Sequence, residues 1–265
     1  MNPMRLVGHD GLFAPDSVTW RLHADPVCVI GGMRALLIQA LEPRAMAGVD
    51  QHSSFRDDPW TRFRNTASFI TPATSGPREA AARLGAVVRR VHKSVRGTDP
   101  VTGLRYRADD PELLAWVHNV LVHSLLTSKR RYGGGISGAD ADRYVLEMTR
   151  LAELVGLGAD AVPHSTAGLR VYLRDRRLVI SDVAHEAKRT VLAPPLPARV
   201  RPAWAMLDVA AVAVLPRKVR ELYGLTWWPT SAGPVRAAAS SAFGVLRMIS
   251  PGPPQLRAAR QRLAA

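Results

Sequence analysis

The segment from Asp110 to Arg131 carries the clearest helix signals in this chain. Asp110 is of a type that commonly caps a helix N-terminus, and Pro111 suits the first helical position. Glu112 complements the helix dipole in the first turn, and the basic run Lys129-Arg130-Arg131 complements it in the last turn. The segment therefore predicts one long α-helix at the centre of the fold.

The other apolar segments are punctuated in the same way. Proline or a capping residue precedes them, and proline, glycine or a basic residue follows several of them, as expected at helix ends. The first predicted helix is capped by Asp16 or Ser17 and runs through Trp20. The others cover Val27–Glu42, Arg44–Val49, Trp60–Phe69, Pro77–Val95 and Ser137–Val155, besides Pro111–Arg131, and Gly97 is expected to end the Pro77–Val95 helix. Only Arg177–Ile180 alternates like a strand. We predict an all-α fold, a single multi-helix bundle domain whose central helices are Pro26–Glu42, Pro77–Val95 and Pro111–Arg131.

The composition suits a helical core. Hydrophobic residues make up 47% of the 265 residues but aromatic ones only 6%, so alanine, leucine and valine supply most of the apolar volume. Gly31-Gly32, inside an apolar predicted helix, permits another backbone to approach closely. The longest apolar run, Ala203–Leu215, is about 13 residues, too short to cross a bilayer, and predicts a buried helix.

The single cysteine, Cys28, excludes an internal disulfide framework and is expected to be a small core residue. The first residues do not resemble a signal peptide, so the expected location is the cytoplasm.

Positive charge is concentrated in the C-terminal part of the chain. Residues 166–265 hold 16 basic and 5 acidic residues, whereas residues 1–165 hold 20 and 17. Such asymmetry indicates contact with an anionic partner, or only an arginine-rich composition, since no run of five basic residues occurs. No nucleic acid is expected, because basic residues are not interleaved with aromatics. The Trp227-Trp228 pair favours weak, peripheral binding to an anionic membrane surface.

Arg62 and Thr66 form the first of three polar signatures set into apolar helices. They lie four residues apart, so a helix places them on one face about one turn from each other. An arginine and a hydroxyl together can orient an anion or a bound oxygen species. The alternative is a salt bridge beside a surface threonine.

His92 is the second signature. Its helix face is predicted to carry, at positions −4, −3, +3 and +4, the residues Val88, Arg89, Val95 and Arg96. Apolar walls with cationic edges suit a haem, whose ring needs apolar packing and whose propionates need cationic partners, and imidazole is a common ligand of haem iron. The alternative is a hydrogen-bonded histidine near a helix end.

His118 completes the set, directly after Trp116-Val117. His123 lies on the same predicted helix but about 140° around it, so the two cannot face one site; His123 is expected to be structural or exposed.

Asp50 and His52 place a carboxylate and an imidazole near a helix end, where capping is the simpler explanation. The run Gly133–Gly138 matches a dinucleotide-binding pattern, but a helix precedes it, so a loop is predicted. Zinc-protease, di-iron and nucleophile-elbow motifs do not occur.

Taken together, the motifs resemble the haem-dependent oxygenases typified by the latex-clearing rubber oxygenases and the mpaB-type enzymes. The stretches that carry the resemblance are Gly11–Arg21, Arg34–Pro43 with Ala47-Gly48-Val49 and His52-Ser53, Arg62-x-x-x-Thr66, His92-x-x-Val95-x-Gly97, and Asp110–His118. The resemblance covers about Gly11 to Gly224. Two positions differ: Asn65 stands beside Thr66 where the rubber oxygenases carry lysine, and Glu42 precedes Pro43 where many relatives carry histidine.

The resemblance implies a fold like the rubber oxygenase core and a haem b-dependent oxygenase that uses dioxygen on an apolar, isoprenoid- or lipid-like substrate. It implies that His92 is the axial ligand of the iron and that Arg62 and Thr66 lie in the same pocket as catalytic residues. Arg89, Arg96 and His118 are the further candidates for binding the haem. The alternative function is a non-catalytic lipid or membrane-surface binding protein with the same helical cavity.

The expected organisation follows the extent of the resemblance. Residues 1–10 are predicted to form a flexible N-terminus, residues 11–224 the all-α oxygenase-like domain, and residues 225–265 a helical, basic appendage.

Overall fold

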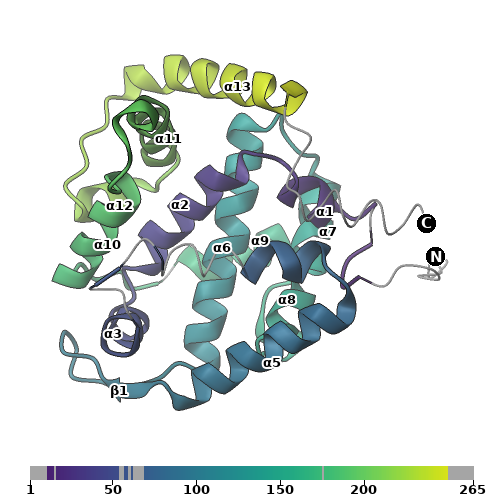
Figure 1. The fold of residues 1–265 in the computed structure, drawn as a ribbon, viewed down its shortest axis with the longest axis vertical. Coiled ribbons are helices and arrows are strands. Elements are labelled where there is room, and N and C mark those ends of the chain that lie inside the picture. Colours follow the sequence, from purple (N-terminus) through teal and green to yellow (C-terminus); the bar gives the residue numbers. More distant parts are fainter. Residues whose placement is uncertain are drawn as a thin grey trace.

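The computed structural model describes residues 11–14, 16–53, 57–58, 61, 69–174 and 176–249 (Figure 1). Within these residues the protein is built from helices and one two-stranded antiparallel sheet, so the all-α prediction is confirmed. The α-helices are α1 (Val18–His23), α2 (Cys28–Gln39), α3 (Pro43–His52), α5 (Arg78–Ser94), α6 (Pro111–Tyr132), α7 (Gly138–Glu147), α8 (Thr149–Leu154), α9 (Thr166–Arg174), α10 (Asp182–Leu192), α11 (Arg201–Ala213), α12 (Arg217–Leu222) and α13 (Ala232–Ile249). The sheet pairs β1 (Arg96–Thr98) with β2 (Arg105–Arg107), and residues 69–75 are also helical.

Helix α6 runs through the middle of the molecule with α2 against it (Figure 1). The two helices approach closely at Gly31, where an added Cβ would lie 2.7 Å from Leu125 Cδ2 and 2.9 Å from its Cα. Gly32 has open space around its Cα. The sequence-based prediction of a close backbone approach is therefore confirmed for Gly31 and wrong for Gly32.

Two apolar cores lie on either side of α6. The larger one joins α2 and α6 with α10, α11, α12 and α13, and the smaller one joins α6 with α1, α7, α8 and α9. Leu121 packs against both cores. Tyrosine hydroxyls bond the larger core across elements: Tyr132 donates to Ala210 O over 2.9 Å and Tyr223 to Leu37 O over 2.7 Å.

The predicted helix starts are confirmed where a side chain caps the helix. Ser17, Asp110 and Ser137 each accept a hydrogen bond from a backbone N–H in the first turn of α1, α6 and α7. The glycine run is a loop, as expected, with Gly134 and Gly135 at positive φ. The predicted helix Trp60–Phe69 falls mostly outside the described residues.

Other predicted boundaries are wrong. The helix expected over Ser137–Val155 is two helices, α7 and α8, which meet at Met148. Gly97 does not end α5, because the helix stops at Ser94 and Gly97 lies in β1. The stretch Arg177–Ile180 is not a strand, although Val179 N–H donates to Leu41 O.

Helix α11, expected to be buried, is only partly so. Ala210 and Ala211 are buried, but Val209 on the opposite side is 45% exposed. Within the described ranges, none of the helices combines the length and the apolar character that a bilayer crossing requires.

Helix α13 lies across one end of the molecule, while α5 and the β1–β2 hairpin lie at the opposite end (Figure 1). Ala239 and Phe243 of α13 belong to the larger core, so the helix packs on the body of the protein. An ion pair adds to this packing: Arg247 donates to the buried carboxylate of Asp25, which also accepts from Lys129 over 2.8 Å. Burial raises the pKa of Asp25, but the hydrogen bonds from Arg247 and Lys129 outweigh it and hold the pKa below its ordinary value.

The α2–α6 contact predicts opposite effects for two adjacent glycines. Gly31→Ala should lower the free energy of unfolding by about 1–3 kcal/mol, because the new methyl overlaps the backbone and side chain of Leu125. Gly32→Ala should raise it by roughly 0.5–1 kcal/mol, because alanine is the better helix former and meets no atom. Urea unfolding of both variants measures this, and similar values for the two would contradict the close contact.

Candidate functional site

The C-terminal end of α5 brings His92 to the edge of the fold. Val95, directly after the helix, packs in a small cluster with Ala47 of α3, Tyr106 of β2 and Leu113 of α6. Val95 O also accepts from Ala108 N–H over 3.0 Å. The end of α5 is therefore fixed against three elements, and His92 stands one turn before this point.

The β1–β2 hairpin is held on α3 by a polar contact. Tyr106 Oη donates to Gln51 Oε1 over 2.8 Å, and the His52 ring nitrogen Nε2 lies 2.9 Å from Arg96 O. Gly97 fits beneath them: an added Cβ would lie 2.7 Å from both Gln51 Oε1 and Tyr106 Oη. A glycine at position 97 therefore allows the hairpin to pack closely on α3, and it does not end the helix α5. His52, the last residue of α3, contacts the hairpin through Arg96 O.

His92 is half-buried and shares a helix face with Gly85, seven residues earlier. This face is turned toward α8, since a Cβ on Gly85 would meet Leu154 O at 2.5 Å. Arg89 lies on the same side, packs against Gly156 and donates to Leu154 O. The imidazole therefore belongs to the inner side of α5.

Arg89 and Arg96 have different surroundings. Arg89 is half-buried, and its guanidinium spans α5 and α8. Arg96 is not on the helix face expected from the sequence, because α5 ends at Ser94; it lies in β1, is exposed, and donates to Lys93 O over 3.1 Å. Its guanidinium is thus at the surface near the end of α5.

His118 is buried, at 7% exposure, two turns into α6. Leu114 and Val122, one turn before and after it, belong to apolar clusters that include residues of α8. Burial lowers the pKa of His118 to about 4, so the imidazole is neutral at physiological pH. A neutral imidazole is the form that can bind a metal or accept a proton. Both His92 and His118 thus lie on helix faces that border α8.

His123 contacts α2 and not the side of α6 that borders α8, as expected from its position about 140° around α6 from His118. Arg34 Nη1 donates to His123 Nδ1 over 3.2 Å and to Ser124 Oγ over 2.6 Å, and Arg34 Nε donates to Val214 O. Burial, followed by the charges of Arg34, Arg130 and Arg170, lowers the pKa of His123 to about 3. The structural role expected for His123 agrees with these contacts.

Two buried polar residues were missed by the sequence analysis. Arg34 is 2% exposed and joins α2, α6 and the end of α11. His23 Nε2 lies 3.1 Å from Tyr144 Oη, and burial lowers its pKa to about 4. Neither a helix cap nor a helical spacing in the sequence distinguishes these two residues from surface residues.

Arg62, Asn65 and Thr66 lie outside the described residues, so the shared pocket with His92 stays a prediction. Glu42, the second position that differs from the family pattern, lies within the described residues. Glu42 precedes α3 and accepts from Arg44 Nε over 2.9 Å, and Arg44 also bonds Glu112 of α6. The carboxylate at this position is thus part of an ion-pair network that joins α3 to α6.

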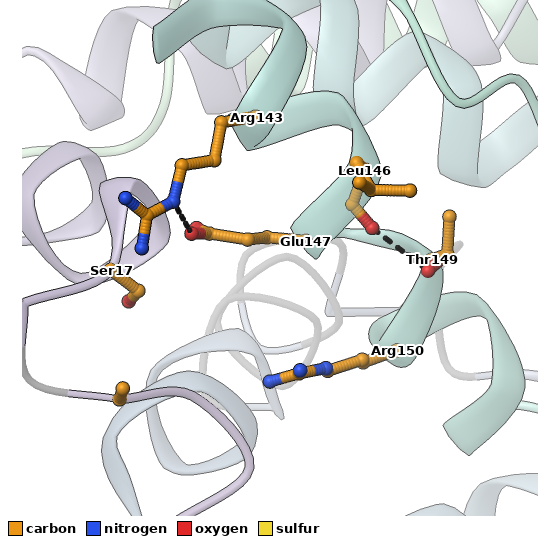
Figure 2. A pocket seen from close by; sticks show the side chains of 7 residues that line it. Ser17, Arg143, Leu146, Glu147, Thr149 and Arg150 are labelled. Carbon is orange, nitrogen blue, oxygen red and sulfur yellow. Dashed lines mark hydrogen bonds and ion pairs between the residues drawn. The ribbon is translucent and has the colours of Figure 1, made fainter. Parts of the chain in front are cut away.

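A hollow of about 350 Å³ lies at another place, between the start of α1 and the α7–α8 junction (Figure 2). Arg143 and Glu147 of α7 and Arg150 of α8 line it. The Glu147 carboxylate accepts from Arg143 Nε and from the N–H and hydroxyl of Thr19. The Glu147 carboxylate therefore links α7 to α1, which is a structural role.

The donor chemistry around His92 is compatible with a haem. Among the described side chains, no three His, Cys, Asp or Glu residues come together as a metal site, but a haem iron needs only one axial side chain from the protein. His92 supplies an imidazole at the inner side of α5, and Val88 beside it is half-buried. Arg96 supplies an exposed cation at the nearby surface.

Comparison with known proteins decides the family. Residues 20–243 match the family described as ER-bound oxygenase mpaB/B'/Rubber oxygenase, catalytic domain. The chain belongs to this family. No curated protein and no solved structure gave a match. The matched region begins within α1 and ends within α13, so it includes α5, the hairpin and α6. The domain boundary at residue 224 stays a prediction, although the match extends past it.

The buried state of His118 predicts a pH dependence. Between pH 6.5 and about 4 the unfolded chain binds a proton at this imidazole and the folded protein does not, so stability present at neutral pH is lost as the pH falls. The contribution of His118 should fall by about 2 kcal/mol from pH 7.5 to pH 5.

Urea unfolding of the haem-free protein at the two pH values tests this. His118→Gln should show a smaller loss of stability than the original protein. His164→Gln is the control, because His164 is exposed, and it should keep the original pH dependence. An unchanged pH dependence in His118→Gln would contradict a neutral buried imidazole.

Proposed function

We propose that the protein is a haem b-dependent oxygenase that uses dioxygen on an apolar, isoprenoid- or lipid-like substrate. The family match, whose description names oxygenases, carries the proposal. The position of His92 supports the haem: it is half-buried, on the inner side of a helix whose end is fixed by three other elements. Bound haem would supply the iron at which dioxygen is activated.

Each candidate residue has a role in this proposal. His92 would hold the haem iron through its imidazole, and the contacts of Val95 with α3, β2 and α6 would keep the end of its helix in place. Arg96, exposed at the surface, would pair with a haem propionate, and Arg89 would stabilise the inner side of the site from its position between α5 and α8. His118 supports the pocket as a neutral imidazole from α6.

Arg62 and Thr66 are proposed as the catalytic pair, on the family motif Arg-x-x-x-Thr. In that role the guanidinium and hydroxyl would orient dioxygen. A lysine cap on the iron is not available from the residue beside Thr66, which is Asn65.

The partners in the proposal are dioxygen, a small apolar substrate and an anionic membrane surface that the protein contacts peripherally from the cytoplasm. The membrane is supported by the charge of residues 166–265, with 16 basic and 5 acidic residues. An attached membrane would also concentrate a lipid-like substrate near the enzyme.

His92→Ala tests the haem assignment. The change removes the bond from protein to iron and leaves the other contacts of α5, so the Soret absorption of protein produced with haem supplied should be lost while helicity measured by circular dichroism is retained. His164→Ala, at an exposed position outside this region, should keep the Soret band. A His92→Ala protein with full haem content and an unchanged spectrum would show that another residue binds the iron.

A further inference from the structure

The outer side of α13 carries uncovered apolar side chains. Ala239 and Phe243 face the core, whereas Val245, Met248 and Ile249 are 50%, 79% and 72% exposed. Met248 and Ile249 are the two most exposed of the large hydrophobic residues in the described ranges. A helix whose one side is in the core and whose other side is also apolar needs a second environment that is not water.

The C-terminal segment of the sequence that includes α13 carries charge of one sign. Between Leu222 and Ala265 the sequence holds five arginines and neither aspartate nor glutamate. In α13 itself Arg236 is exposed. Trp228 lies just before the helix and is 69% exposed. Apolar side chains, an interfacial tryptophan and cations without acids are the features of a surface that binds anionic lipid.

Only one tryptophan of the pair expected to bind the membrane is exposed to solvent. Trp227 is half-buried, and the guanidinium of Arg220 lies 5.9 Å from the centroid of its ring. Trp228 alone is exposed. The apolar contact must therefore come mainly from α13, which the sequence analysis did not single out.

Inner contacts hold α13 in place without using this surface. Arg247 bonds Asp25 and also donates to Tyr132 O, while Arg131 of α6 donates to Ala232 O at the start of α13. These contacts anchor the helix near both of its ends. The helix is therefore a fixed part of the body, and its outer side can meet a flat surface along its length (Figure 1).

We propose that the outer side of α13, with Trp228 at one end and Val245, Met248 and Ile249 at the other, docks on an anionic lipid surface. The inference rests on the membrane contact in the proposed function and gives it a defined surface; it does not depend on haem. A second copy of the chain fits less well, because a symmetric contact through this surface would bring the same cationic helices together. The surface lies at the end of the molecule opposite α5, so docking leaves the end that carries His92 directed away from the bilayer (Figure 1).

Vesicle co-sedimentation of the full chain tests the surface. The original protein should bind phosphatidylcholine–phosphatidylserine vesicles at low salt more tightly than phosphatidylcholine vesicles. Met248→Gln combined with Ile249→Gln should weaken binding to the anionic vesicles about tenfold, because two inserted side chains become polar. Val87→Gln combined with Val91→Gln is the matched control, since these α5 residues are 54% and 53% exposed at the opposite end, and it should bind like the original protein.

Each other outcome overturns the proposal in a distinguishable way. Binding to anionic vesicles that the α13 variant does not weaken, or that both variants weaken equally, would keep the membrane partner but reject this surface. Absence of binding by the original protein would reject the membrane contact as well. A dimer in solution that the α13 variant dissociates, without vesicle binding, would assign the surface to a second copy. Haem absorption of the same preparations tests the oxygenase proposal separately.

Discussion

The close contact of α2 and α6 is the constraint on which the rest of the structure depends. At Gly31 the helices are near enough that a single methyl group would overlap the partner's backbone, and such proximity brings the flanking apolar side chains into full contact. The same approach lets Gln39 and Trp116 exchange hydrogen bonds with the opposite helix. Because each of the two cores is built on α6, an error in this contact would displace elements in both.

Close packing also determines where charge can be tolerated. Arg34 lies inside the α2–α6 contact and bonds neutral groups, namely a carbonyl, a hydroxyl and an imidazole. Burial lowers its pKa to about 10, which still leaves the guanidinium charged at neutral pH. Burial, followed by the charges of Arg34, Arg130 and Arg170, lowers the pKa of His123 to about 3, so the imidazole beside Arg34 is neutral. Asp25 shows the other solution, since two cations compensate its buried charge.

The sequence predicted local features well and long-range ones poorly. Capped helix starts at Ser17, Asp110 and Ser137 were predictable because a cap bonds a backbone group only a few residues away. The hairpin was not, because its strands have three residues each and because Gly97 packs against Gln51, which is distant in sequence. The break at Met148 and the burial of Arg34 likewise depend on partners that no local pattern reveals. In the candidate site, the helical setting of His92 and His118 was predictable, but the position of Arg96 was not, since it depends on where α5 ends.

Helices α5 and α13 lie at opposite ends of the molecule (Figure 1) and differ in which side chains they bury and which they expose. Helix α5 carries a histidine and an arginine on its inner side, and its end is bonded into α3, β2 and α6, as a site needs if an imidazole is to keep its position. Helix α13 is anchored through Arg247 and Ala232, and its side chains toward the solvent are left apolar. Water alone would select polar residues at Met248 and Ile249, because an exposed apolar patch weakens solubility and stabilises nothing in the monomer. Rigid attachment from within and an apolar exterior together are the arrangement expected of a helix whose second partner is a surface outside the protein.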